Sequence, residues 1–120
     1  MSAQATVLVV DDDPTIRLLC RINLELDGHT VVEAGTIGEA RSLLAAGADV
    51  VLLDVHVAGE DGRDFLAELR RERPQLPVAL LTGSTERGEL LRAEADALIP
   101  KPFTIDELRQ TVERLAAGRR

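Results

Sequence analysis

The chain has 120 residues, of which 45% are hydrophobic, and a net charge of −7 from 21 acidic and 14 basic residues. This length fits one globular domain, no apolar run approaches the roughly 20 residues of a membrane-spanning helix, and the negative charge argues against direct nucleic-acid binding. A single cysteine, Cys20, and an N-terminus without a signal-peptide pattern favour a cytoplasmic protein with no membrane contact.

The first part of the chain alternates short apolar runs with helical patterns. Residues 7–10 form an apolar run that predicts a strand. Asp13 and Pro14 predict the start of a helix, because a capping acid followed by proline suits the first helical turn. This helix carries Cys20 on its apolar face and ends near Gly28.

The middle of the chain continues the same alternation. A weaker strand is predicted at 30–33, and a second helix starts with the capping-box spacing of Thr36 and Glu39. The continuous apolar run at 50–53 is typical of a strand buried on both faces. A third helix is predicted from about 62 to 73, before a proline.

The last part of the chain completes the pattern. Strands are predicted at 78–81 and 97–99, separated by a short helix near 85–94. A second capping box, formed by Thr104 and Glu107, opens the final helix.

Five strands that alternate with five helices predict an α/β fold: a (βα)5, flavodoxin-like, doubly wound parallel sheet. The three most apolar strands, at 7–10, 50–53 and 78–81, should be central, with the other two at the edges. This gives the strand order 2-1-3-4-5. We expect residues 1–120 to form this single domain, with no output domain present.

Polar residues follow the predicted strands. Asp11 and Asp12 come after the first strand, Asp54 after the third, Thr82 after the fourth and Lys101 after the fifth. Since the carboxyl ends of parallel strands meet at one edge of the sheet, we expect these side chains to share one cleft.

The chemistry of this set is that of phosphoryl binding. Clustered carboxylates repel one another, and a hard cation with oxygen ligands, such as Mg²⁺, relieves that repulsion. Asp54 could then act as a nucleophile, because carboxylates form aspartyl-phosphates. Thr82 would supply a hydroxyl donor, and Lys101, the one lysine among 14 basic residues, a compact positive charge.

Over essentially its whole length the chain resembles the receiver domains of two-component response regulators. The matching motifs appear in order, each after a predicted strand. They are VVDDDP at 9–14, LLD at 52–54 followed by Asp61-Gly62, LLTG at 80–83 and KPF at 101–103.

The resemblance implies a function for each site residue. Asp54 would be the phosphoacceptor, with Thr82 and Lys101 binding the phosphoryl group. Magnesium would be held by Asp54, by Asp12 directly, by Asp11 through water and by the backbone carbonyl of His56. In the family the bond between Lys101 and Pro102 is usually cis.

The resemblance also implies partners. A histidine kinase or phosphotransfer protein would donate the phosphoryl group, and a downstream protein or an output domain would receive the signal. Such a domain accepts a phosphoryl group and dephosphorylates itself, and we therefore do not expect an enzyme that turns over an external substrate.

The sequence departs from the family pattern in three places. Val57-Ala58 stands where the family commonly has Met-Pro, and Leu98 stands where it commonly has an aromatic residue. The stretch from 82 to 101 is also a few residues shorter than usual, within the fourth predicted helix. We expect Leu98 to stay buried in both signalling states, so that the response to phosphorylation is local.

Three other functions are alternatives to the phosphoacceptor. A receiver-like interaction or scaffolding module without phosphate is compatible with Leu98 and the short helix, although the complete acidic site argues against it. A phosphohydrolase of the aspartyl-phosphate kind needs an acid two residues after the nucleophile, where this chain has His56. Nucleotide binding is disfavoured because no glycine-rich loop follows the first strand.

Several polar residues have purely structural explanations. Asp13 is expected to cap its helix rather than bind metal. His29 and His56 are expected to be loop residues, not a metal pair. A solvated face is expected for three acidic residues, namely Glu60, Asp61 and Asp64.

Overall fold

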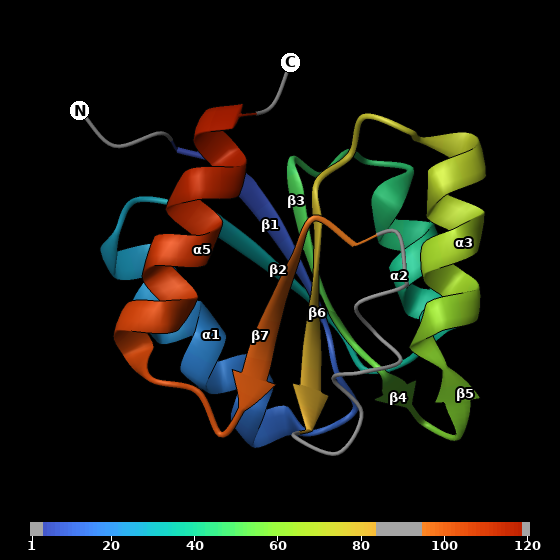
Figure 1. Cartoon of the computed structure of the whole chain (residues 1–120), viewed down its shortest axis with the longest axis horizontal. Helices are drawn as coiled ribbons and strands as arrows, with labels where there is room; N and C mark the ends of the chain where they lie inside the picture. Colours follow the sequence, from blue (N-terminus) through green and yellow to red (C-terminus); the bar gives the residue numbers. More distant parts are fainter. Residues whose placement is uncertain (1–3, 84–94, 119–120) are drawn as a thin grey trace.

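A computed structural model describes residues 4–83 and 95–118, and at its centre lies a five-stranded parallel sheet (Figure 1). The strand order is β2-β1-β3-β6-β7. The short strands β4 and β5 form a separate sheet, so β6 and β7 are the fourth and fifth strands of this one, and the predicted order 2-1-3-4-5 is confirmed. The strands of the sheet are β1 (Thr6–Val10), β2 (Thr30–Ala34), β3 (Val50–Asp54), β6 (Val78–Gly83) and β7 (Ala97–Lys101).

Helices cover both faces of the sheet. Figure 1 shows α1 (Pro14–Leu26) and α5 (Ile105–Gly118) on one side, and α2 (Ile37–Leu44) and α3 (Gly62–Glu72) on the other. These four helices match the predicted ones within a few residues. The helix predicted at 85–94 lies outside the described residues.

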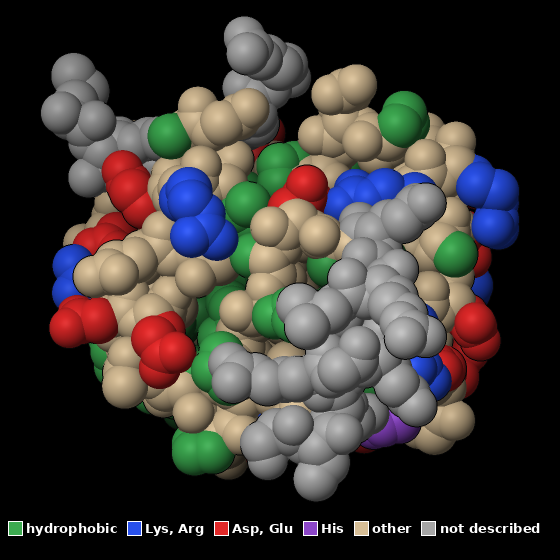
Figure 2. All heavy atoms as spheres, viewed as in Figure 1, with side chains coloured by type: hydrophobic (Ala, Val, Ile, Leu, Met, Phe, Trp, Pro, Cys, Tyr) green, Lys and Arg blue, Asp and Glu red, His purple; other side chains and the backbone are tan. Residues whose placement is uncertain are grey.

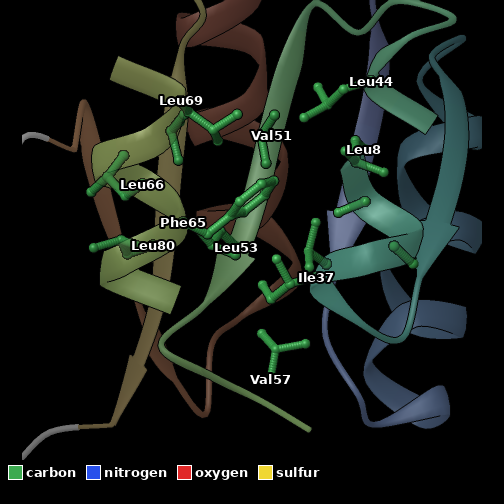
Figure 3. Packing of buried hydrophobic residues seen from close by; sticks show 14 of the residues in the cluster. Leu8, Ile37, Leu44, Val51, Leu53, Val57, Phe65, Leu66, Leu69 and Leu80 are labelled. Carbon is green, nitrogen blue, oxygen red and sulfur yellow. The ribbon is translucent and has the colours of Figure 1, made fainter. Parts of the chain in front are cut away.

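The sheet separates two hydrophobic clusters. Side chains alternate along each strand, so Val7 and Val9 pack toward α1 and α5, while Leu8 and Val10 pack toward α2 and α3. Phe65 of α3 lies within the cluster between the sheet and helices α2 and α3 (Figure 3). Burial on both faces explains why the central strands are almost continuously apolar.

The helix starts follow from side chains that accept main-chain hydrogen bonds. Asp13 accepts from the N–H of Thr15, which confirms its predicted capping function. Thr104 and Glu107 form a reciprocal capping box, with N···O distances of 3.0 and 2.9 Å. At α2, Thr36 accepts from the N–H of Glu39, as expected.

A short hairpin between β3 and α3 was not predicted. Its strands are β4 (His56–Val57) and β5 (Glu60–Asp61), and they pair antiparallel. The two turn residues, Ala58 and Gly59, have φ angles of 50° and 84°, in the left-handed region. Such a two-residue turn joins antiparallel strands without splaying them.

Three residues differ from their expected surroundings. His29 lies in the loop before β2, as expected, but it is buried there, and its Nδ1 accepts from the N–H of Ala5. Leu98 is only partly buried, because β7 is an edge strand. Asp61 is not merely solvated, since it caps α3 by accepting from the N–H of Arg63.

The surface carries charges of both signs. Figure 2 shows acidic and basic side chains interspersed over the visible face. Several pair in two-point contacts: Arg41 with Glu68 at 2.8 Å, and Arg109 with Asp27 at 2.6 and 2.9 Å. Among the described residues, no helix combines the length and the apolar character that a membrane span requires.

Candidate functional site

Three carboxylates meet at the carboxyl end of the sheet. Asp11 and Asp12 follow β1, and Asp54 is the last residue of β3, the strand that pairs directly with β1. One oxygen from each of the three lies within 4.8 Å of the others. The structure therefore brings together the three acids that the sequence analysis selected, while Asp13 stays with its helix.

Asp11 is fully buried and its carboxylate is engaged on both sides. Oδ1 accepts from the N–H of Asp13 at 2.9 Å, and Oδ2 accepts from the Nζ of Lys101 at 2.7 Å. Its carbonyl oxygen accepts from Arg17 at 2.7 Å. These contacts fix Asp11 at the bottom of the site and give its buried charge a partner.

Lys101 joins the acids of two strands. Its Nζ lies 2.7 Å from Asp11 Oδ2 and 3.3 Å from Asp54 Oδ2. Burial alone would lower the pKa of Lys101, but the hydrogen bond to Asp11 and the charges of both carboxylates outweigh it and raise the pKa. The ammonium group is therefore charged at neutral pH and held beside Asp54.

The surroundings of Asp54 change the pKa of its carboxyl group. Its partial burial, followed by the charge of Asp11, raises its pKa above the usual range for aspartate. Lys101 and the main-chain N–H of His56 act in the opposite direction. The negative charge of Asp54 is thus costly in this position, and a further cation at the site would relieve that cost.

Asp12 is more exposed than its two neighbours. Its Oδ2 accepts a hydrogen bond from the main-chain N–H of Ala58 in the hairpin turn, at 2.9 Å. His56, whose carbonyl the resemblance assigns to the metal, lies in β4, two residues after Asp54. The hairpin therefore forms part of the site.

Thr82 is buried near the end of β6, the strand next to β3. Asp54 pairs with Leu81, so Thr82 stands one residue beyond Asp54 in the register. Its hydroxyl donates to the carbonyl of Gly83 at 2.9 Å. Thr82 therefore lies on the neighbouring strand one position beyond Asp54, and its hydroxyl is bonded to its own strand.

Gly62 allows α3 to begin against the end of β3. A Cβ at this position would clash with the carbonyl oxygen of Asp54, and the N–H of Gly62 donates to the carbonyl of Val55 at 2.6 Å. The Asp61-Gly62 pair, noted in the sequence as part of a motif, thus has a packing explanation: no larger residue fits there.

Two contributors were missed in the sequence. Arg17 binds the carbonyl of Asp11 and also pairs with Glu33 at 3.1 Å. Ala58 contributes only its main-chain N–H, which leaves no signature in the residue type. In the sequence, Arg17 is marked only by its position in the first helical turn after Pro14. That position alone is too weak an indication to select Arg17 as a site residue.

The donor set fits a hard divalent cation. The cluster offers carboxylate oxygens and, among the described residues, no histidine nitrogen or cysteine sulfur joins it. Magnesium prefers a few carboxylates and keeps several waters, which suits a partly open site of this kind. Burial first, and then the charge of Asp11, raises the pKa of Asp54, and a bound cation would favour its ionised form.

Residues 7–113 match the family model of the response regulator receiver domain. Among curated proteins, the chain is 39% identical over 110 residues to the probable transcriptional regulatory protein TcrX of Mycobacterium tuberculosis, covering 86% of the chain and 46% of that protein. It is 34% identical to the C4-dicarboxylate transport transcriptional regulatory protein DctD of Pseudomonas aeruginosa, covering 98% of the chain and 26% of DctD. The chain therefore spans about half the length, or less, of these relatives.

Solved structures give the same result for the fold. The receiver domain of NtrX from Brucella abortus superposes with a TM-score of 0.87 at 31% identity, over 93% of this chain and 98% of that one. A response regulator receiver domain protein from Clostridium thermocellum reaches 0.87 at 28% identity, over 94% of each chain.

Proposed function

Because this chain belongs to the response regulator receiver domain family, we propose that it is a Mg²⁺-dependent phosphoacceptor that takes a phosphoryl group on Asp54. The donor would be a phosphorylated histidine of a kinase or phosphotransfer protein. The phosphorylated state would then alter binding to a downstream protein or output domain.

The transfer is a substitution at phosphorus. A carboxylate oxygen of Asp54 attacks the phosphorus atom of the donor, and the bond from phosphorus to the histidine nitrogen breaks. The leaving imidazole keeps the electron pair and takes a proton from solvent, while Asp54 becomes an acyl phosphate. Asp54 enters this reaction as a carboxylate, because the attacking oxygen must be ionised, and the neighbouring charge of Lys101 favours that form.

Lys101 and Thr82 would bind the transferred group. In the structure Lys101 divides its charge between Asp11 and Asp54, at 2.7 and 3.3 Å. A phosphoryl group on Asp54 adds negative charge within reach of the same ammonium group. Thr82 could exchange its local bond to the Gly83 carbonyl for a phosphoryl oxygen.

Asp11, Asp12 and Asp54 would hold the magnesium ion, with the His56 carbonyl completing the protein ligands. A bound Mg²⁺ would neutralise charge on the carboxylates and on the phosphoryl oxygens during transfer. Asp12 and Asp54 keep contact with solvent, whereas Asp11 is buried and fixed by Lys101.

The observation that carries this proposal is the convergence of three carboxylates and a lysine from three strands. A scaffolding module would need neither the charge repulsion at Asp54 nor a partly buried lysine beside it. These features cost stability, and a phosphoacceptor gives them a use.

The test is phosphorylation by acetyl phosphate, followed by intact mass. We expect a gain of one phosphoryl group that requires Mg²⁺ and is lost with Asp54→Asn. Glu72→Gln is the control: it also removes one negative charge, at the last residue of α3, and should leave the gain in mass intact. A mass gain that persists unchanged in Asp54→Asn would refute the assignment, and no gain in the unmodified chain would favour the scaffolding alternative.

A further inference from the structure

Asp12 is the exposed acid of the site, and the β4–β5 hairpin holds it. Asp11 bonds to Lys101 and to its own loop, whereas Asp12 is exposed and accepts from the N–H of Ala58, 46 residues away. An exposed carboxylate without such a bond rotates freely among its rotamers. The contact at 2.9 Å ties one of its oxygens to the main chain of the hairpin.

The hairpin is itself firmly placed. Val57, the residue before Ala58, is completely buried and belongs to the cluster that contains Phe65, where it lies at the lower end in Figure 3. At the other side of the turn, Asp61 caps α3. The position of the Ala58 N–H is therefore fixed by the core on one side and by a helix on the other.

Ala58 holds an unusual backbone conformation for this purpose. Its φ of 50° lies in the left-handed region, which a residue other than glycine adopts at a cost. Proline, which the family commonly has at this position, can neither adopt this φ nor donate a hydrogen bond. Hence the contact to Asp12 depends on the departure from the family pattern at this residue.

We propose that the main-chain N–H of Ala58 is a positioning group for Asp12. It holds Oδ2 and leaves the other carboxylate oxygen directed to the cation. Hydrogen bonds to a ligating carboxylate orient it, and their loss lowers metal affinity by about 10- to 100-fold. The inference rests on the proposed metal site and adds to it a group from the hairpin.

Three variants separate the N–H from the shape of the turn. Ala58→Pro removes the N–H and the left-handed φ together. Gly59→Ala strains the turn at a φ of 84° but keeps the Ala58 N–H. Ala58→Gly keeps the N–H and relieves the strain. The dissociation constant for Mg²⁺ is measured for each by titration calorimetry, with thermal midpoints in chelator to verify folding.

We expect Ala58→Pro to raise the Mg²⁺ dissociation constant by about 10- to 100-fold. Gly59→Ala and Ala58→Gly should stay within about threefold of the unmodified chain, below that range. An unchanged or tighter dissociation constant for Ala58→Pro would overturn the inference, because the N–H would then compete with the metal for Asp12.

Amide exchange at Ala58 in the unmodified chain gives an independent readout that needs no variant. Exchange should be slow both in chelator and with Mg²⁺, since the bond persists in both states. Exchange that becomes fast when Mg²⁺ binds would show that the bond breaks, and this too would overturn the inference. If the unmodified chain binds no Mg²⁺, the metal site of the proposed function fails first, whereas normal binding with an insensitive Ala58→Pro leaves that function intact.

Discussion

The contact between Gly62 and the carbonyl of Asp54 predicts that Gly62→Ala strongly destabilises the domain. The added methyl group would overlap a main-chain oxygen, which cannot turn aside as a flexible side chain can. The start of α3 must therefore shift, and with it Phe65 and Leu66, both about 2% exposed. A shift also weakens the hydrogen bond from the Gly62 N–H to Val55.

Overpacking of this kind costs about 1–3 kcal/mol, and a weakened buried hydrogen bond adds about 1 kcal/mol. We therefore expect the free energy of unfolding to fall by about 3 kcal/mol. The unfolding entropy is about 2.1 cal/mol/K per residue. For 120 residues this gives about 0.25 kcal/mol/K, so the thermal midpoint should fall by about 12 °C.

Thermal unfolding followed by circular dichroism in chelator provides the assay. Gly38→Ala in α2 is the matched control, because a Cβ there meets its nearest neighbour, Thr36 Oγ1, at an ordinary 3.9 Å. Alanine favours a helix more than glycine does, so this control should raise the midpoint by about 2 °C, from about 0.5 kcal/mol. Equal midpoints for Gly62→Ala and the unmodified chain would refute the close approach of α3 to β3.

Three further predictions concern charge, capping and the response to phosphorylation. Asp54→Asn should raise the free energy of unfolding at pH 7 in chelator, and the gain should shrink as pH falls from the raised folded pKa to the ordinary one. Glu33→Gln should lower the free energy of unfolding at pH 7. Hydrogen bonds from Arg21 first, and then from Arg17, lower the pKa of Glu33 against the effect of burial. The stability that ionised Glu33 contributes is therefore lost as pH falls through this lowered pKa. Denaturant titrations across pH 3–7 measure the free energy of unfolding of both variants, and an increase at pH 7 for both would contradict these opposite expectations. Thr104→Ala should cost about 1 kcal/mol by removing the N-cap of α5, whereas an unchanged midpoint would show that this capping box adds nothing. Beryllofluoride should shift amide resonances near Asp54 and Thr82 and change β7 and α5 little, because Leu98 has no ring to reorient; wide shifts over β7 and α5 would contradict this.

The sequence predicted the sheet, and the placement of three acids and a lysine at its edge, because both depend on strong local patterns. Runs such as 50–53 are apolar on both faces, and a residue that follows such a strand must lie at its carboxyl end. Asp11, Asp54 and Lys101 therefore followed from strand positions alone. The strand order followed from the contrast between the apolar central strands and the more polar edges.

Features that depend on main-chain geometry could not be predicted in this way. The β4–β5 hairpin has Ala58 at a position where glycine or asparagine would have signalled the turn. His29 gave no sign that its ring would accept from Ala5, a residue 24 positions earlier in the chain. Leu98 was expected to be buried from its residue type, but exposure at an edge strand depends on the neighbouring elements.

The division of the core by the sheet has a practical consequence for redesign. The two hydrophobic clusters share no residue within the described part of the chain, and the strands stand between them. Substitutions on opposite sides of such a barrier combine additively when they are more than about 7–10 Å apart. Helix α1 lies on one side of the sheet, and the hairpin and α3 lie on the other. The outer surface of α1, where Leu18, Ile22 and Leu26 are at least half exposed, can therefore be redesigned while the hairpin and α3 are left unchanged.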